Sequence, residues 1–301
     1  MSTDTSALLS PRARPVGLRY LSCLRLSDIL VLQGPPLLGA AFALRPPLAE
    51  HAAVLAILVA ANICLVAHVF VVNDWANLPT DLADPNRSSD VFTAHGVERH
   101  AMGLLAVGLL AAGVLLGDLL GPAALGLTVG VAACSTLYSV PWFDWKGTPI
   151  LNSIAHLVGG TLHFLIGYSL GSGVDVRGLA IGAFFALIFA AGHLAQEVRD
   201  HRSDVRAGIR TNAVIFGVRR TFTASLALFG LAHALLLALA WRGSVPGALA
   251  VLVLFYVIQV RWSLDALAEG LTHATMCRLQ TRYRVLYAAA GVAMVAGLWL
   301  Q

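Results

Sequence analysis

A polar segment in the middle of the chain, residues 196–211, places acidic and basic side chains at regular spacing. It reads QEVRDHRSDVRAGIRT and directly follows an apolar run at 179–194. Glu197, Asp200 and Asp204 stand at i, i+3 and i+7, so a continuing helix would place them on one face. Carboxylate oxygens suit a hard divalent cation, and guanidinium groups pair with phosphate through forked contacts. The segment therefore predicts a site for a metal-bound phosphate ester, with four interspersed arginines: Arg199, Arg202, Arg206 and Arg210.

A second acidic segment, residues 73–90, follows another apolar run and reads NDWANLPTDLADPNRSSD. Its polar positions follow a 0, 3, 7, 10 spacing, which is one helical face if the helix persists. Pro79 removes a helical hydrogen bond and clashes with the preceding turn, so we expect the helix to kink or stop near Leu78 and the later aspartates to lie in a new turn or loop. Two such segments favour a ligand site over a solvated helix end. The polar positions are Asp74, Asn77, Asp81 and Asp84.

A third polar segment, residues 138–152, reads YSVPWFDWKGTPILN. Lys146 can serve as a point-charge ligand for phosphate, and Tyr138 brings a hydroxyl to the membrane border. The alternative is a basic anchor among interfacial aromatic residues. The phosphate role is favoured because this segment is expected on the same side of the membrane as both acidic segments.

Polar residues within apolar runs are costly in a bilayer and are therefore candidates for function. Asn152, His156 and His163 form one stripe, and His193 precedes Glu197 by four residues. A histidine here could orient or deprotonate a phenol or enol acceptor. Alternatively, the histidines bond to neighbouring helices or backbone carbonyls. Glu197 itself is a candidate base, metal ligand or arginine partner, and the sequence leaves these roles open.

The elements that must position these residues are transmembrane helices. The chain has 301 residues, of which 58% are hydrophobic and 12% charged, and its mean hydropathy is +0.77. Soluble domains carry roughly 25% charged residues, so the composition indicates an all-α polytopic membrane protein. Residues 1–22 are polar and are expected to form a cytosolic arm, without a cleaved signal peptide, before a transmembrane domain at 23–301.

Nine apolar runs, each about 18 to 24 residues long, predict nine transmembrane helices. All but three of the twenty Lys and Arg residues fall on the N-terminal arm and the even-to-odd connections. The positive-inside rule then places the N terminus and both acidic segments in the cytoplasm and the C terminus outside. Because the basic residues follow membrane sidedness, nothing indicates nucleic-acid binding. The runs are 24–44, 51–72, 98–117, 119–138, 150–171, 177–195, 221–241, 245–262 and 284–300.

Together, these segments resemble the UbiA superfamily of intramembrane prenyltransferases over most of the chain. The first family motif matches Asn73, Asp74, Asn77 and Asp81, followed by Asn86 and Arg87. The second matches Asp200, Asp204, Gly208 and Thr211. A third stretch is similar at Tyr138, Ser139, Pro141 and Lys146, and Arg25 matches an arginine that opens the first helix. Two departures are Asn77, where the family has aspartate, and the nearby Pro79.

The resemblance implies two four-helix halves plus a final helix, and a site for two Mg²⁺ ions and a prenyl diphosphate. The metal ligands it suggests are Asn73, Asp74, Asn77, Asp81, Asp200 and Asp204, with Asp84 as a hypothetical substitute for the missing aspartate. The diphosphate-binding residues would be Arg25, Arg87, Lys146, Arg199 and Arg210, with Tyr138 near the ionising carbon. The candidates for the acceptor site are Asn152, His156, His193 and Glu197.

The leading hypothesis is a Mg²⁺-dependent prenyltransferase of a bacterial plasma membrane, with a prenyl diphosphate and a small aromatic or quinone-precursor acceptor as substrates. Three alternatives stay open. A UbiA-type terpene synthase would cyclise the same cation without an acceptor. A transporter or lipid-binding scaffold would instead place its acids at the bilayer midplane. A member damaged by Asn77 and Pro79 would bind but not react.

Overall fold

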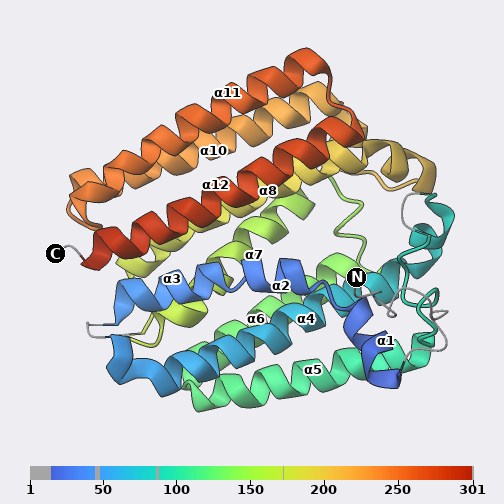
Figure 1. Ribbon diagram of the computed structural model, residues 1–301, viewed down its shortest axis with the longest axis horizontal. Helices are drawn as coiled ribbons and strands as arrows, with labels where there is room; N and C mark the ends of the chain where they lie inside the picture. The colour runs from blue at the N-terminus through green and yellow to red at the C-terminus, as the bar shows by residue number, and fades with distance from the viewer. Residues whose placement is uncertain (1–14, 45–47, 86–87, 172, 300–301) are drawn as a thin grey trace, which may run out of the picture.

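The computed structural model describes residues 15–44, 48–85, 88–171 and 173–299. Within these ranges the regular structure is helical, without a strand. Figure 1 shows the helices in order. They are α1 (Val16–Cys23), α2 (Leu26–Val31), α3 (Gly34–Ala43), η3 (Leu48–His51), α4 (Ala52–Ala83), α5 (Arg99–Leu119), α6 (Pro122–Ser139), α7 (Leu151–Tyr168), α8 (Val176–Ala207), α9 (Asn212–Phe216), α10 (Val218–Trp241), η4 (Gly247–Leu252), α11 (Val253–Glu269) and α12 (His273–Trp299).

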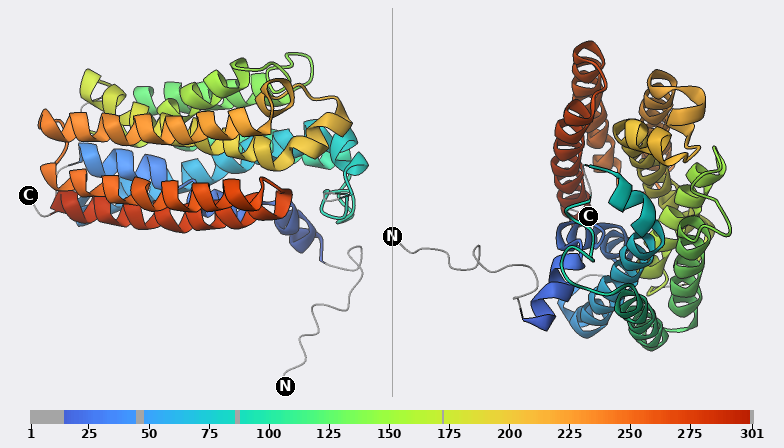
Figure 2. Two further views of the ribbon diagram at one scale, coloured as in Figure 1. Left: turned by 90° about the horizontal axis from the view of Figure 1, so that it is seen from above. Right: turned by 90° about the vertical axis from the view of Figure 1, so that its right-hand side faces the viewer.

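The long helices lie lengthwise beside one another in a single bundle, as the views in Figure 2 show. Helix α7 packs against α3, α6 and α8, while α4 pairs with α5 and α8 pairs with α10. The last helix, α12, contacts α8, α3 and α11. The first and second halves of the chain therefore meet where α7 packs against α3 and α6, and again along α3 and α12.

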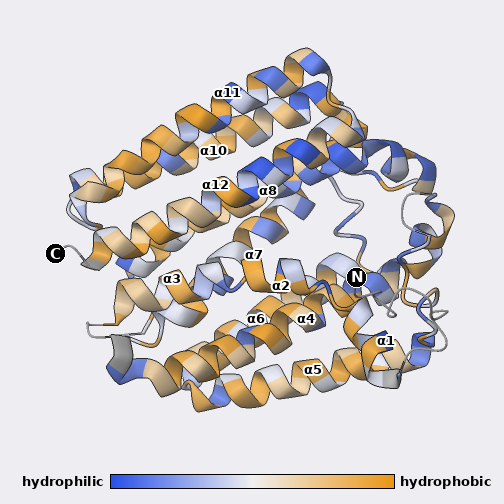
Figure 3. Ribbon diagram, in the orientation of Figure 1, coloured by the Kyte–Doolittle hydropathy of each residue, from blue (hydrophilic) through white to orange (hydrophobic). Residues whose placement is uncertain are grey.

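Seven helical segments of the described chain are long and apolar enough to cross a membrane. They correspond to seven of the nine predicted spans. Helices α7 and α12 occupy the two remaining ranges but carry more polar residues, so the count of nine stays a prediction. At 1.5 Å per residue, the 32-residue helices α4 and α8 are about 48 Å long, more than the ~30 Å hydrocarbon core. Hydrophilic residues gather at the end where both helices finish (Figure 3).

We expected the second span to kink or stop near Leu78, with Asp81 and Asp84 in a new turn or loop. The expected stop is wrong, and so is the expected place of Asp81. Helix α4 continues through Pro79 to Ala83, and Asp84 caps its C-terminal end. Proline has no N–H, so the helix gives up one hydrogen bond, to the Trp75 carbonyl, and continues through its remaining bonds. Thr80 Oγ1 also donates to the Asn77 carbonyl at 2.7 Å, which satisfies one of the acceptors in the disturbed turn. Asp81 therefore stays on the helical face that carries Asp74.

Helices α3 and α7 approach closely at two glycines. A Cβ atom on Gly167 would overlap the Pro36 carbonyl, and one on Gly39 would overlap the Phe164 carbonyl. Within a membrane, water supplies no hydrophobic driving force between helices, so helices associate through close packing. Small residues at the crossing allow the two backbones to come that close. This contact fixes α3 beside α7 on one side of the cavity described below.

Candidate active site

The first acidic segment presents its polar side chains along one face of α4. Arg25, at the start of α2, donates a hydrogen bond to Asp74. Asn77 Nδ2 donates to Asn73 Oδ1 at 2.8 Å, and Lys146 Nζ donates to Asn77 Oδ1 at 3.1 Å. The amide at position 77 therefore connects the α4 face to the lysine of the third polar segment.

The second acidic segment forms the last three turns of α8. Arg199 donates two hydrogen bonds to Asp200, from Nε to Oδ1 at 2.7 Å and from Nη2 to Oδ2 at 2.8 Å. Gly208 ends the helix in the left-handed conformation at φ 70°, which turns the chain back so that Thr211 Oγ1 can donate to Asp204 Oδ2 at 3.2 Å. Asp204 also interacts electrostatically with Lys146 and Asp200.

The polar ends of α4 and α8 meet directly. Asp84 accepts a hydrogen bond from Ser203 Oγ at 2.6 Å and forms an ion pair with Arg206 at 3.4 Å. Lys146 bridges the same gap, because it bonds to Asn77 on one side and interacts with Asp204 on the other. The structure thus brings all three predicted polar segments to one end of the bundle. Asp84, the hypothetical substitute for the missing aspartate of the first motif, is 5% exposed and already bonds to Ser203 of α8.

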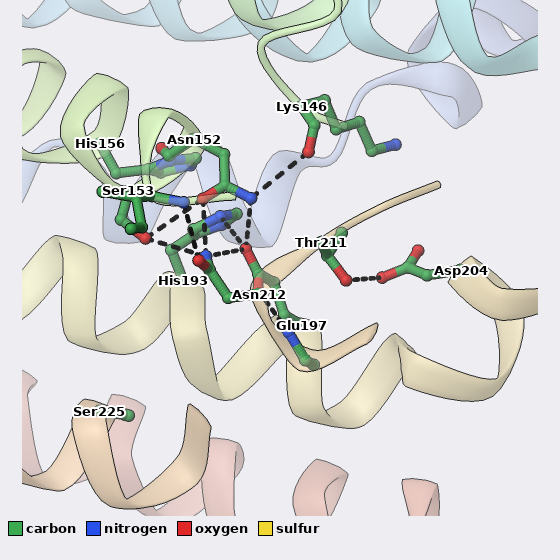
Figure 4. A network of polar contacts seen from close by, with 12 residues as sticks. Lys146, Asn152, Ser153, His156, His193, Glu197, Asp204, Thr211, Asn212 and Ser225 are labelled. Atoms are coloured by element: carbon green, nitrogen blue, oxygen red, sulfur yellow. Dashed lines mark hydrogen bonds and ion pairs between the residues drawn. The ribbon is translucent and has the colours of Figure 1, made fainter. Parts of the chain in front are cut away.

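Glu197 lies at the centre of a buried amide network (Figure 4). Its Oε1 accepts from Asn152 Nδ2 at 2.7 Å and Asn212 Nδ2 at 3.1 Å, and its Oε2 accepts from the Ala213 backbone at 3.2 Å. The side chain is 3% exposed. Asn152 Nδ2 also donates to the Lys146 carbonyl at 3.3 Å, so the network holds the lysine-bearing segment against α8.

Three aromatic rings pack beside this network. His156 and His193 stack with centroids 3.5 Å apart, and Tyr138 meets His156 edge-on at 4.9 Å. His156 Nδ1 donates to the Asn152 carbonyl at 2.7 Å, and His193 Nε2 lies 2.9 Å from Glu197 Oε1. Asn152, Glu197 and the two histidines are therefore close together, as an acceptor site would need. Their assignment to the acceptor stays a prediction.

Two of the predicted phosphate ligands, Arg87 and Arg210, remain to be placed. Arg87 lies outside the described residues, and Arg210 is exposed in the turn before α9. Sequence reasoning missed Asn212, which bonds to both Asn152 and Glu197. Asn212 directly follows Thr211 at the start of α9, and this place next to the second acidic segment was the one signal in the sequence.

A cavity of about 1100 Å³ lies next to the polar end, between α2 and α3 on one side and α7, α8 and α12 on the others. Its lining is mostly apolar and aromatic, with Phe184, Phe189 and Tyr287 among the rings. Its polar members include Gln196 and Gln280. A long apolar ligand with a polar head matches this combination.

The sequence profile of the UbiA prenyltransferase family matches residues 34–276, which include all three polar segments. The chain belongs to this family. Its members are prenyltransferases, and the chain is an enzyme of that class.

Solved structures of UbiA proteins have the same fold. A UbiA homologue from Archaeoglobus fulgidus bound to GPP and Mg²⁺ is 18% identical, with a TM-score of 0.73 over 92% of this chain and 99% of that one. The apo UbiA homologue from Aeropyrum pernix K1 is also 18% identical, with a TM-score of 0.66 over 90% and 96% of the two chains. Digeranylgeranylglyceryl phosphate synthase is 16% identical, with a TM-score of 0.68 over 93% and 97%. A comparison with curated protein sequences gave no match.

The acidic residues of this UbiA prenyltransferase fit magnesium that is shared with a phosphate. Among the described residues, no group of three or more His, Cys, Asp or Glu could hold a metal ion. Mg²⁺ normally takes only one or two carboxylates and completes its shell with water and substrate phosphate. Asp74 and Asp81 interact electrostatically on α4, as do Asp200 and Asp204 on α8. Two such pairs suit metal bound together with a diphosphate rather than in an all-protein cage.

Proposed function

We propose that this UbiA protein transfers a prenyl group from a prenyl diphosphate to a small aromatic or quinone-precursor acceptor, with Mg²⁺ as cofactor. One observation carries the proposal: Lys146 joins the polar ends of α4 and α8, each of which bears a carboxylate pair, and these ends lie next to an apolar cavity of about 1100 Å³ that Gln196 of α8 helps to line. The arrangement separates a charged head site from an apolar tail site, as an amphipathic diphosphate requires.

Two Mg²⁺ ions would be held by Asn73, Asp74 and Asp81 on α4 and by Asp200 and Asp204 on α8. Bound Mg²⁺ would stabilise the negative charge that develops on the leaving diphosphate. Because Asn77 replaces an aspartate and bonds to Lys146, it contributes a neutral oxygen at most.

The chain's cations would bind the phosphate oxygens. Arg25 bonds to Asp74, Lys146 bonds to Asn77, and Arg199 is oriented by Asp200. Fixed cations of this kind act most strongly where water is excluded. Arg87 and Arg210 remain further candidates from the sequence.

In the reaction, the bond between C1 and the bridging oxygen breaks and its electron pair leaves with the diphosphate. A nucleophilic carbon of the acceptor bonds to C1, and the acceptor then loses a proton. Tyr138 lies beside the acidic residues, with which it interacts electrostatically, and would face the ionising carbon. The aromatic and aliphatic cavity wall would keep water from capturing the cation.

We further propose that nine helices span a bacterial plasma membrane with the acidic site on the cytoplasmic side. The distribution of Lys and Arg supports this orientation, with the C terminus outside. The polar ends of α4 and α8 would then project beyond the hydrocarbon core, where the soluble diphosphate head can enter.

The test uses the purified full chain in lipid with radiolabelled geranyl, farnesyl and longer diphosphates and a pool of phenolic acceptors. Mg²⁺-dependent diphosphate release and a labelled adduct are expected, and both should vanish with EDTA or in Asp74→Ala and Asp200→Ala. A labelled hydrocarbon or terpene alcohol formed without acceptor would identify a terpene synthase instead. Donor binding without diphosphate release would refute catalysis by this chain.

A further inference from the structure

The polar end of the apolar cavity is formed by amide side chains from two helices. Gln196 projects from α8 and Gln280 from α12, and both line the cavity. The remaining lining is largely Leu, Val, Ala and aromatic residues. A few polar groups at one end of an apolar cavity usually orient a ligand rather than stabilise the fold.

Both glutamines have unused hydrogen-bonding capacity. Gln196 is exposed to the cavity, and its amide forms no hydrogen bond within the part of the chain that the structure describes. Gln280 Oε1 accepts from Arg199 Nη1 at 2.7 Å, whereas its Nε2 is buried without a partner among the described residues. Most buried polar atoms in proteins are hydrogen-bonded, so this donor beside the cavity is available to a water or a ligand atom.

The position of Gln280 places this amide pair beside the reaction centre. The guanidinium of Arg199 joins Gln280 to Asp200, one of the proposed metal ligands. A molecule held by the glutamines would therefore lie at the end of the cavity where the diphosphate leaves. This is the place that a prenyl acceptor must occupy to reach C1.

The charge of the lining limits which acceptor fits. Among the described lining residues Arg284 is the one with a permanent charge, and Asp28 of α2 pairs with it at 2.9 Å. Asp28 already balances the charge of Arg284, so a carboxylate or phosphate on the acceptor would add a net negative charge to the lining. Neutral oxygens need only the amide groups, so a neutral acceptor avoids burying an uncompensated charge.

We propose that Gln196 and Gln280 bind the hydroxyl or carbonyl oxygens of an uncharged aromatic acceptor, such as a phenol, hydroquinone or quinone. This inference rests on the proposed function and specifies its acceptor class. It differs from the assignment of His156, His193, Asn152 and Glu197 to the acceptor, because none of those four lines the cavity.

The test compares a hydroquinone with its carboxylate-bearing analogue on the full chain in lipid nanodiscs. Wild type is expected to prefer the neutral acceptor at least tenfold in kcat/KM. Gln196→Leu should raise the acceptor KM about tenfold, the value of one lost hydrogen bond, while the donor KM stays within twofold. Gln196→Asn should recover part of this loss, because it restores the amide. Preference for the carboxylate, or an acceptor KM that responds to His193→Asn but not to Gln196→Leu, would overturn the proposal.

A direct binding measurement separates this inference from the proposed function. If no donor releases diphosphate, the transferase proposal fails, but binding of the neutral hydroquinone can still be titrated calorimetrically. Gln196→Leu should then raise its Kd about tenfold, and the carboxylate analogue should bind wild type more weakly. Equal Kd values for wild type and Gln196→Leu would refute the amide site.

Discussion

Replacing Glu197 with alanine should destabilise the protein, because three buried donors would each lose the carboxylate as a hydrogen-bond acceptor. They are the Asn152 and Asn212 amides and the Ala213 backbone N–H, all within 2.7–3.2 Å of the carboxylate. An unsatisfied buried donor costs about 1–3 kcal/mol, so complete loss of the three would cost about 3–9 kcal/mol. Rearrangement of the two amides relieves part of this, and we expect about 3–5 kcal/mol for Glu197→Ala.

The measurement is the free energy of unfolding in mixed micelles, with Glu269→Ala as the matched control. Glu269 pairs with Arg278 at 2.6 Å, but both side chains are more than half exposed, so its removal should change stability by at most about 1 kcal/mol. Glu197→Gln keeps one acceptor oxygen, so its free energy of unfolding should lie between those of Glu197→Ala and Glu269→Ala. The reasoning would be refuted if Glu197→Ala had wild-type stability yet lost activity, because Glu197 would then act in the chemistry itself.

Three further predictions concern the head site and the packing. Lys146→Met should raise the donor KM about 10–100-fold, because a charge-assisted hydrogen bond contributes about 1.5–3 kcal/mol; an unchanged KM in steady-state assays would exclude Lys146 from the phosphates. Chelation by EDTA should abolish diphosphate release and excess Mg²⁺ should restore it, whereas release unaffected by EDTA would contradict the metal site. Gly167→Val should lower the yield of folded protein and its melting temperature, since a Cβ there overlaps Pro36, while Gly159→Ala on the same helix should match wild type because nothing lies within 4 Å of its Cβ.

Helix-length apolar runs and regular acidic spacing were enough to locate the main elements of the site. Asp200 and Asp204 lie on α8 as their spacing predicted, and Lys146 lies between Asn77 and Asp204, while its role as a phosphate ligand stays a prediction. Pro79 suggested a kink or an end near Leu78, because proline removes a helical hydrogen bond, but α4 continues past it to Ala83. The span count stayed unsettled because the polar residues of α7, among them Asn152, His156 and His163, lower the hydropathy of this helix.

The sequence by itself determined the class of the protein, its approximate helices and the three polar segments, because periodicity and composition are local properties. Only the tertiary structure decided which partner each polar group takes. It bonded Glu197 to amides from α7 and α9, tied Asp84 to α8, and set Gln196 and Gln280 at the end of one cavity. Asn152 and Glu197 are 45 positions apart in the sequence, and Asp84 and Ser203 are 119 apart, so no spacing rule connects them. Their meeting depends on how α4, α7, α8 and α12 pack side by side.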